Sequence, residues 1–233
     1  MWKALLSIVK LSAKGPTDVN QISEESKTSI EVVKNTLSDL TSKDLIETVH
    51  GKVTTSSRQR VDIAMMALRE GADPESVCKY LGWTEFEEVA AIALEANRFF
   101  TKKHVHFRST KGRFEIDVLG FLEPTIVSVD CKHWKRSWQR AATARMVEAQ
   151  LLRTGELAKL LPELKEKLGI SRWKKAKLMP VVLTLSDTPF KVHNGVPVVS
   201  VHRFQNFLSD LPSYEESLVT INIDLPSSIR SAD

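Results

Sequence analysis

The sequence predicts an α/β protein of the α+β type, in which an N-terminal helical module precedes a mixed-sheet core flanked by helices. Three observations predict this class. The first 100 residues show mostly helical periodicity, interrupted by one short hairpin pattern. Two adjacent β-type runs, 114–121 and 125–131, are separated by Glu123-Pro124, which is typical of a turn. A long helical stretch, 141–168, is then followed by two further apolar β-type runs.

The first module consists of three predicted helices and a hairpin. Helical patterns cover 2–13, 17–23 and 30–40, and two β-type segments, 45–49 and 52–55, flank His50-Gly51. In that order these elements resemble a winged helix-turn-helix, and we assign residues 1–57 to it.

A DNA-binding role for this module would place the helix that begins near Ser29 in the major groove. Its outward positions include Lys34 and Asn35, which suit contacts with phosphates or bases. Glu31 and Asp39 on the same helix oppose tight DNA binding. Dimerisation or contact with another protein is therefore an equal alternative for this module.

Residues 58–83 are predicted to form a helical connector, and residues 84–233 the second domain. Within the connector, Asp73-Pro74 is an N-cap followed by proline at the first helical position. The second domain would open with a helix from Thr84 to Arg98. Thr84 and Glu87 have the spacing of a capping box, which gives Glu87 a purely structural role as one alternative.

The two β-type runs carry the candidate catalytic residues. Alternation places Asp117 on one sheet face with Leu119 and Phe121, with Ile116 on the other. Asp130 and Lys132 share a face at the end of the second run.

A buried carboxylate is costly unless it is paired or binds a metal. Asp117 and Asp130 would hold Mg²⁺ (or Mn²⁺) through oxygen, and Lys132 would orient a water or neutralise charge on a phosphate. An internal salt bridge between Lys132 and Asp130 is the structural alternative.

These residues resemble the motif of the PD-(D/E)xK nuclease superfamily, which has the restriction-endonuclease-like fold, and its Mrr-like and archaeal Holliday-junction-resolvase-like members in particular. The resemblance covers about residues 84–210. It implies metal ligation by Asp117, Asp130 and the backbone carbonyl of Cys131, with Lys132 as the motif lysine. Glu87 matches the glutamate of the first family helix, with Glu88 as the fallback ligand. The proline that usually precedes the first aspartate is replaced by Ile116.

The segments that follow complete the expected domain. Gln150, within the helix 141–168, sits near where relatives place a helical glutamine and is a weak candidate site residue. Apolar β-type runs are predicted at 178–185 and 196–201, followed by a closing helix at 203–211.

Charge is concentrated around the acidic cluster. Residues 101–180 carry 18 basic and 8 acidic side chains, in a chain whose overall net charge is +4. A polyanion would be attracted to this segment. The predicted nucleic-acid contacts, including the two from the helical module, are Lys135, Arg136, Arg140, Lys111, Arg113, Lys34 and Asn35.

Composition indicates an intracellular, cytoplasmic protein without a membrane segment. Cys78 and Cys131 lack the spacing of a zinc site and are expected to be free thiols. No apolar run reaches the roughly 18 residues that a membrane span requires.

The favoured function is a metal-dependent endonuclease that hydrolyses DNA phosphodiester bonds, with branched or otherwise structured DNA as a candidate substrate in repair or restriction. The alternatives are a non-catalytic nucleic-acid-binding or regulatory protein on the same fold and an RNA-processing nuclease. Cleavage of both strands would call for a homodimer.

Overall fold

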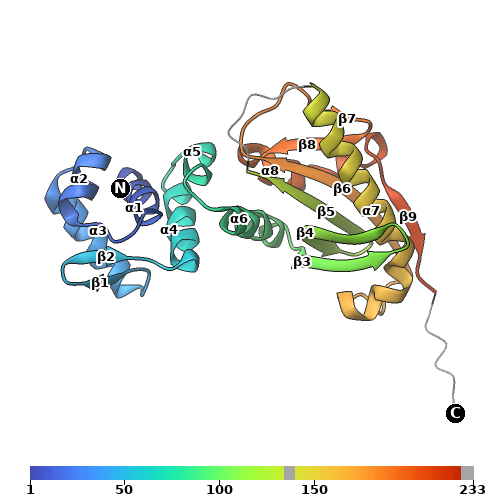
Figure 1. The fold of residues 1–233 in the computed structure, drawn as a ribbon, viewed down its shortest axis with the longest axis horizontal. Helices are drawn as coiled ribbons and strands as arrows, with labels where there is room; N and C mark the ends of the chain where they lie inside the picture. Colours follow the sequence, from blue (N-terminus) through green and yellow to red (C-terminus); the bar gives the residue numbers. More distant parts are fainter. Residues whose placement is uncertain (134–139, 227–233) are drawn as a thin grey trace, which may run out of the picture. The chain divides into compact units, whose positions relative to one another are not determined.

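The computed structural model describes residues 1–133 and 140–226. The chain divides into two compact units, Met1–Val89 and Ala90–Asp233. It has the predicted mixed α+β class, with one two-stranded sheet and one seven-stranded mixed sheet (Figure 1). The segment 58–83, predicted as a connector, belongs to the first unit.

The first unit has the element order of the predicted helix-turn-helix with a β-hairpin. Its elements are α1 (Trp2–Ser12), α2 (Val19–Ser26), α3 (Ile30–Ser42), β1 (Glu47–Val49), β2 (Lys52–Thr54), α4 (Ser57–Arg69), α5 (Pro74–Cys78) and the start of α6 (Trp83–Ala96). Asp18 caps α2 through the backbone N–H groups of Asn20 and Gln21, and Ser29 caps α3. A bridge between Thr17 and Val53 joins the hairpin to the segment before α2.

The start of α6 differs from the prediction. The helix begins at Trp83, so Thr84 is its second residue rather than its cap. The acidic side chain that reaches back to the backbone is Glu85, whose Oε2 accepts from Gly82 N at 2.5 Å. The alternative that Thr84 and Glu87 form a capping box is therefore wrong. The helix begins earlier than that box requires, and Glu85 instead of Glu87 accepts from the backbone N–H before the helix.

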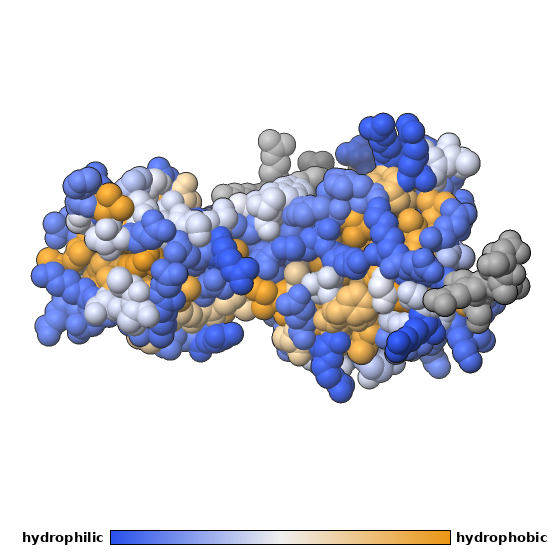
Figure 2. Space-filling view, turned by 90° about the horizontal axis from the view of Figure 1, so that it is seen from below, coloured by the Kyte–Doolittle hydropathy of each residue, from blue (hydrophilic) through white to orange (hydrophobic). Residues whose placement is uncertain are grey.

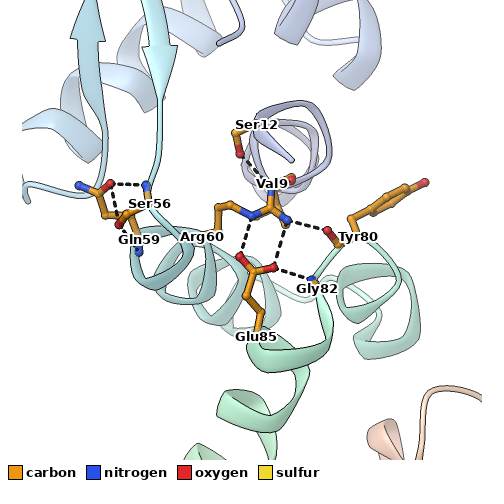
Figure 3. A network of polar contacts seen from close by, with 8 residues as sticks. All are labelled: Val9, Ser12, Ser56, Gln59, Arg60, Tyr80, Gly82 and Glu85. Carbon is orange, nitrogen blue, oxygen red and sulfur yellow. Dashed lines mark hydrogen bonds and ion pairs between the residues drawn. The ribbon is translucent and has the colours of Figure 1, made fainter. Parts of the chain in front are cut away.

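Glu85 also takes part in a buried ion pair with Arg60 of α4 (Figure 3). Arg60 Nε donates to Glu85 Oε1 at 2.9 Å, and both side chains are less than a tenth exposed. The guanidinium also donates to Tyr80 O at 2.6 Å, to Ser12 Oγ at 3.2 Å and to Val9 O. One arginine thus connects α1, α4, the segment after α5 and the start of α6.

The second unit is built on the seven-stranded sheet. Its elements are the rest of α6, β3 (Phe100–Ser109), β4 (Gly112–Leu122), β5 (Thr125–Lys132), α7 (Arg140–Leu168), β6 (Lys175–Thr184), β7 (Val192–His193), β8 (Val196–Ser200), α8 (Val201–Ser209), α9 (Leu211–Tyr214), a 3₁₀ turn (Glu215–Ser217) and β9 (Ile221–Asp224). The strand order is β3-β4-β5-β6-β8-β7, and β9 pairs with β6. The pairs β5–β6 and β6–β8 are parallel, while β3–β4 and β4–β5 are antiparallel.

The main core of this unit lies between the sheet and α7. Helix α7 lies over the sheet (Figure 1). Its residues Leu157, Leu161 and Leu168 share one core with residues of β4, β5 and β6. Gly120 of β4 lies against Leu94 of α6, and an added Cβ there would approach Leu94 Cδ2 to 2.7 Å. The predicted strands at 114–121, 125–131, 178–185 and 196–201 are all present within two or three residues of their ends.

The exposed surface is mostly hydrophilic on the face drawn in Figure 2, with small apolar patches between the polar residues. The larger exposed apolar side chains of the first unit include Ile30, Val32 and Val49. Among residues 1–133 and 140–226, no helix combines the length and apolarity that crossing a membrane would require.

Removing one partner of the buried Arg60–Glu85 pair should destabilise the protein strongly. We expect Arg60→Met to lower the free energy of unfolding by about 3–5 kcal/mol, because Glu85 would stay buried without its cation. The double variant Arg60→Met/Glu85→Gln should lose less than the sum of the two single variants. Urea unfolding followed by circular dichroism measures these differences.

Arg58→Met is the matched control, since Arg58 is exposed on the same helix. Its free energy of unfolding should change by no more than about 0.5 kcal/mol. Equal urea midpoints for Arg60→Met and Arg58→Met would contradict a stabilising role for the pair.

Candidate functional site

The candidate site lies where the ladder between β4 and β5 stops. The last paired residues are Val118 and Val129, and extending the register by one residue sets Asp117 opposite Asp130. At this point Asp117 Oδ2 accepts a hydrogen bond from Cys131 N at 2.7 Å. The Asp117 side chain thus accepts from a backbone N–H of β5 that lies beyond the last residue pair of the β4–β5 ladder.

The side-chain alternation of β4 is interrupted at Asp117. Ile116 before it and Leu119 and Phe121 after it all belong to the same core against α7. In a regular strand Ile116 and Leu119 would point to opposite faces. Opposite Asp117 on β3, His104 has a positive φ of 50°. The prediction that Ile116 faces away from Leu119 and Phe121 is therefore wrong, because the strand changes face at Asp117.

Asp130 is buried and carries two cationic partners. Its side chain is 1% exposed, with Lys132 Nζ at 2.8 Å from Oδ2 and Arg153 Nη2 at 2.6 Å from Oδ1. Lys132 lies two residues further along β5, as the period-two pattern predicted. Arg153 comes from α7 and was not predicted.

The pKa of Asp117 is raised above the ordinary aspartate value. Burial is the largest cause, and the nearby charge of Asp130 acts in the same direction. The Cys131 N–H, Lys132 and Arg153 act against this rise. Two carboxylates thus lie near each other where ionising Asp117 is unfavourable.

Polar side chains of α7 hold β5 beneath the site. Gln150 Nε2 donates to Ser128 O at 2.7 Å, and Thr154 Oγ1 lies 3.2 Å from Ser128 Oγ. Gln150 and Thr154 are fully buried. The candidate residue Gln150 therefore lies on α7 and contacts β5 at Ser128, two residues before Asp130. It is buried, so it can position the strand but is not exposed to a substrate.

The spacing of residues along α7 could have predicted that Arg153 faces the sheet. Gln150, Arg153, Thr154 and Leu157 follow the i, i+3, i+4, i+7 spacing of one helix face. A buried face that includes a glutamine, an arginine and a threonine is unusual, because such groups require partners. The partners, Ser128 and Asp130, lie more than twenty residues away in sequence.

Glu87 is buried on α6, within the first unit. Across residues 1–133 and 140–226, no group of three or more His, Cys, Asp or Glu side chains is arranged to hold a metal ion. The backbone N–H of Cys131 points towards β4, so its carbonyl points to the same side of β5.

The predicted nucleic-acid contacts are surface residues where the structure describes them. Arg140 is exposed at the start of α7, and Arg113 is exposed on β4. Lys111 lies 3.6 Å from the carboxylate of Glu156. Lys34 and Asn35 are exposed on α3. Lys135 and Arg136 lie outside the described residues.

No protein-family model matches the chain. Two solved structures are similar to parts of it. One is titled protein of unknown function AF1548, with 21% identity, a TM-score of 0.29, and coverage of 42% of this chain and 44% of that chain. The other is protein VC1899 from Vibrio cholerae, with 12% identity, a TM-score of 0.37, and coverage of 93% and 52%. The chain spans about half the length of these two solved chains.

A sequence relative comes from Archaeoglobus fulgidus and is described as an uncharacterized protein. It is 31% identical over 132 residues, which are 57% of this chain and 93% of the relative. Because the match spans nearly all of that relative, the chain belongs to the same family as this Archaeoglobus fulgidus protein.

Proposed function

We propose that the chain is a metal-dependent endonuclease that hydrolyses DNA phosphodiester bonds, with branched or otherwise structured DNA as its substrate. The observation that carries the proposal is the pair Asp117 and Asp130 on facing strands where their ladder ends. Burial and the charge of Asp130 disfavour the ionised form of Asp117. A divalent cation next to both carboxylates would reverse that preference.

The residues present fit a hard cation such as Mg²⁺ or Mn²⁺. Two carboxylates and the Cys131 carbonyl are oxygen ligands, and Mg²⁺ in proteins is often held by one or two carboxylates together with water and substrate phosphate. A bound ion would polarise a phosphoryl oxygen and lower the pKa of a water molecule. Glu87 is a further ligand candidate from the family resemblance alone.

The protein's own groups would position the substrate. Lys132 extends beside Asp130 at the end of β5 and is partly exposed, so its ammonium can orient a water or donate to a phosphate oxygen. The excess of basic residues between 101 and 180 would attract the DNA backbone. Arg140, Arg113 and Lys111 are the described members of this set.

One observation favours the non-catalytic alternative. Asp130 already has two cationic partners, Lys132 and Arg153, which is what a purely structural ion-pair network would require. An RNA-processing nuclease would use the same residues, since the hydrolysis of both backbones has the same chemistry. Two buried free cysteines agree with an intracellular location, where thiols remain reduced. Cleavage of both strands would require a homodimer.

The first prediction tests the carboxylates. Asp130→Asn and Asp117→Asn should each lower Mg²⁺-dependent DNA cleavage by at least about a hundredfold, because each removes a charged ligand at the reacting phosphate. DNA binding should persist. Gel assays with branched, single-stranded and duplex DNA and RNA, with Mg²⁺, Mn²⁺ or chelator, measure cleavage.

Glu148→Gln is the control, since it removes one negative charge from an exposed position on α7. It should cleave like the wild type. Full Mg²⁺-dependent activity in Asp130→Asn would exclude the assignment, and so would activity that resists chelator.

The second prediction concerns Lys132. Lys132→Met should reduce turnover at saturating DNA by about two to four orders of magnitude if the ammonium acts on the water or the transition state. Single-turnover kinetics at several DNA concentrations separates turnover from affinity. A loss confined to affinity would identify Lys132 as a phosphate contact only.

The third prediction concerns the metal-free protein and pH. Because folding raises the pKa of Asp117, the protonated carboxyl group favours the folded state. This stabilisation is complete below the ordinary aspartate pKa and is lost as pH rises through the pKa of Asp117 in the folded protein. Asp117→Asn retains an oxygen for Cys131 N–H but carries no charge. The variant should therefore gain stability relative to the wild type as pH rises from about 4 to about 8.

Urea unfolding in chelator at both pH values measures this difference. Added Mg²⁺ should stabilise the wild type and leave Asp117→Asn nearly unchanged. A stability difference that is independent of pH would show that Asp117 ionises normally in the folded protein.

A further inference from the structure

The Arg153–Asp130 contact has an unusual geometry for a buried ion pair. Arg153 reaches Asp130 Oδ1 through Nη2 alone, at 2.6 Å. Arginine and carboxylate often pair through two parallel hydrogen bonds, which makes the interaction stronger and more directional. Across residues 1–133 and 140–226, this is the one hydrogen bond that the Arg153 side chain makes.

A second donor of the same guanidinium is buried without an acceptor. Among the described residues, Nε of Arg153 has no hydrogen-bond partner and almost no solvent exposure. A buried donor left unsatisfied loses its hydrogen bonds to water without gaining others, which is unfavourable. The observed position of Arg153 is therefore held by its attraction to Asp130 and opposed by the desolvation of Nε.

Asp130 also has an oxygen that is incompletely satisfied. Oδ2 lies 2.8 Å from Lys132 Nζ but has no partner with hydrogen-bond geometry among the described residues. With Asp117 nearby, a cation bound to Asp130 would compete with Arg153 for the same carboxylate. The side chain of Arg153 is 21% exposed, so part of its guanidinium is already at the surface.

We propose that Arg153 is a displaceable counter-ion: it neutralises Asp130 in the metal-free protein, and a divalent cation displaces it from Asp130 onto a phosphate of the DNA. This inference rests on the proposed nuclease function and adds a residue that the family motif does not include. A guanidinium suits the contact with a DNA phosphate, because its planar donors match phosphate oxygens. In the metal-free protein Asp130 pairs with Arg153. In the DNA complex Asp130 would pair with the cation and Arg153 with a phosphate.

The exchange predicts opposite effects of one substitution on two ligands. Arg153→Gln removes the competitor, so it should bind Mn²⁺ about tenfold more tightly than the wild type, as a repulsion of a little over 1 kcal/mol is lost. Isothermal titration with Mn²⁺ in the absence of DNA measures this affinity. Arg153→Lys keeps the charge and should bind Mn²⁺ nearly as weakly as the wild type.

DNA binding supplies the second measurement. In Ca²⁺, used as a non-hydrolysing cation, Arg153→Gln should bind DNA more weakly, and the slope of log affinity against log salt should become about one unit shallower. In chelator, the affinity of Arg153→Gln should equal that of Arg145→Gln. Arg145 is exposed on the same helix, so its substitution controls for the loss of one positive charge.

Unchanged or weaker Mn²⁺ binding by Arg153→Gln would overturn the exchange, and so would an equal loss of DNA affinity in Ca²⁺ and in chelator. Wild-type protein that binds Mn²⁺ while Arg153→Gln behaves like Arg145→Gln would overturn this inference alone. Wild-type protein that binds no Mn²⁺ would overturn both this inference and the proposed nuclease. Thermal melts of Arg153→Gln and Arg153→Lys establish that both variants fold.

Discussion

The second unit depends on keeping Asp130 neutralised inside a sheet. Asp130 is almost fully buried on β5, and β5 is flanked by β4 on one side and β6 on the other. An isolated carboxylate there would cost several kcal/mol even after relaxation of its surroundings. Lys132 reaches it from the same strand and Arg153 from α7. The position of α7 over the sheet is therefore linked to the charge of one residue.

The polar contacts around Ser128 extend this link. Gln150 and Thr154 bond to Ser128, which precedes Asp130 by two residues on the same face of β5. Three hydrogen bonds to Ser128 thus join α7 to β5 here. Further along the helix, Leu157 and Leu161 make apolar contacts instead. Hydrogen bonds fix the direction of a contact, whereas apolar packing does not. The register of α7 along β5 is set by these groups.

The sequence predicted what depends on near neighbours. The period of two placed Asp130 beside Lys132, and the Glu123-Pro124 turn joined two antiparallel strands. It did not predict Arg153, because its partner is 23 residues away and arginine on a helix is usually a surface residue. The change of face at Asp117 was also missed, because strict alternation assumes a regular strand. The start of α6 was misplaced because Glu85 and Glu87 both lie near the helix start, and the contact with Arg60 favours Glu85.

Arg60, which is buried, and Arg153, which is partly exposed, differ in how many acceptors their guanidinium groups have. Arg60 donates to a carboxylate, to a hydroxyl and to two backbone carbonyls, so Nε and both terminal nitrogens have acceptors. Moving it would break contacts with three other segments, and no ligand could replace them all. Across the described residues, the Arg153 side chain has one acceptor, the carboxylate of Asp130. A fully satisfied arginine fixes a structure, whereas one held by a single charge remains available for exchange.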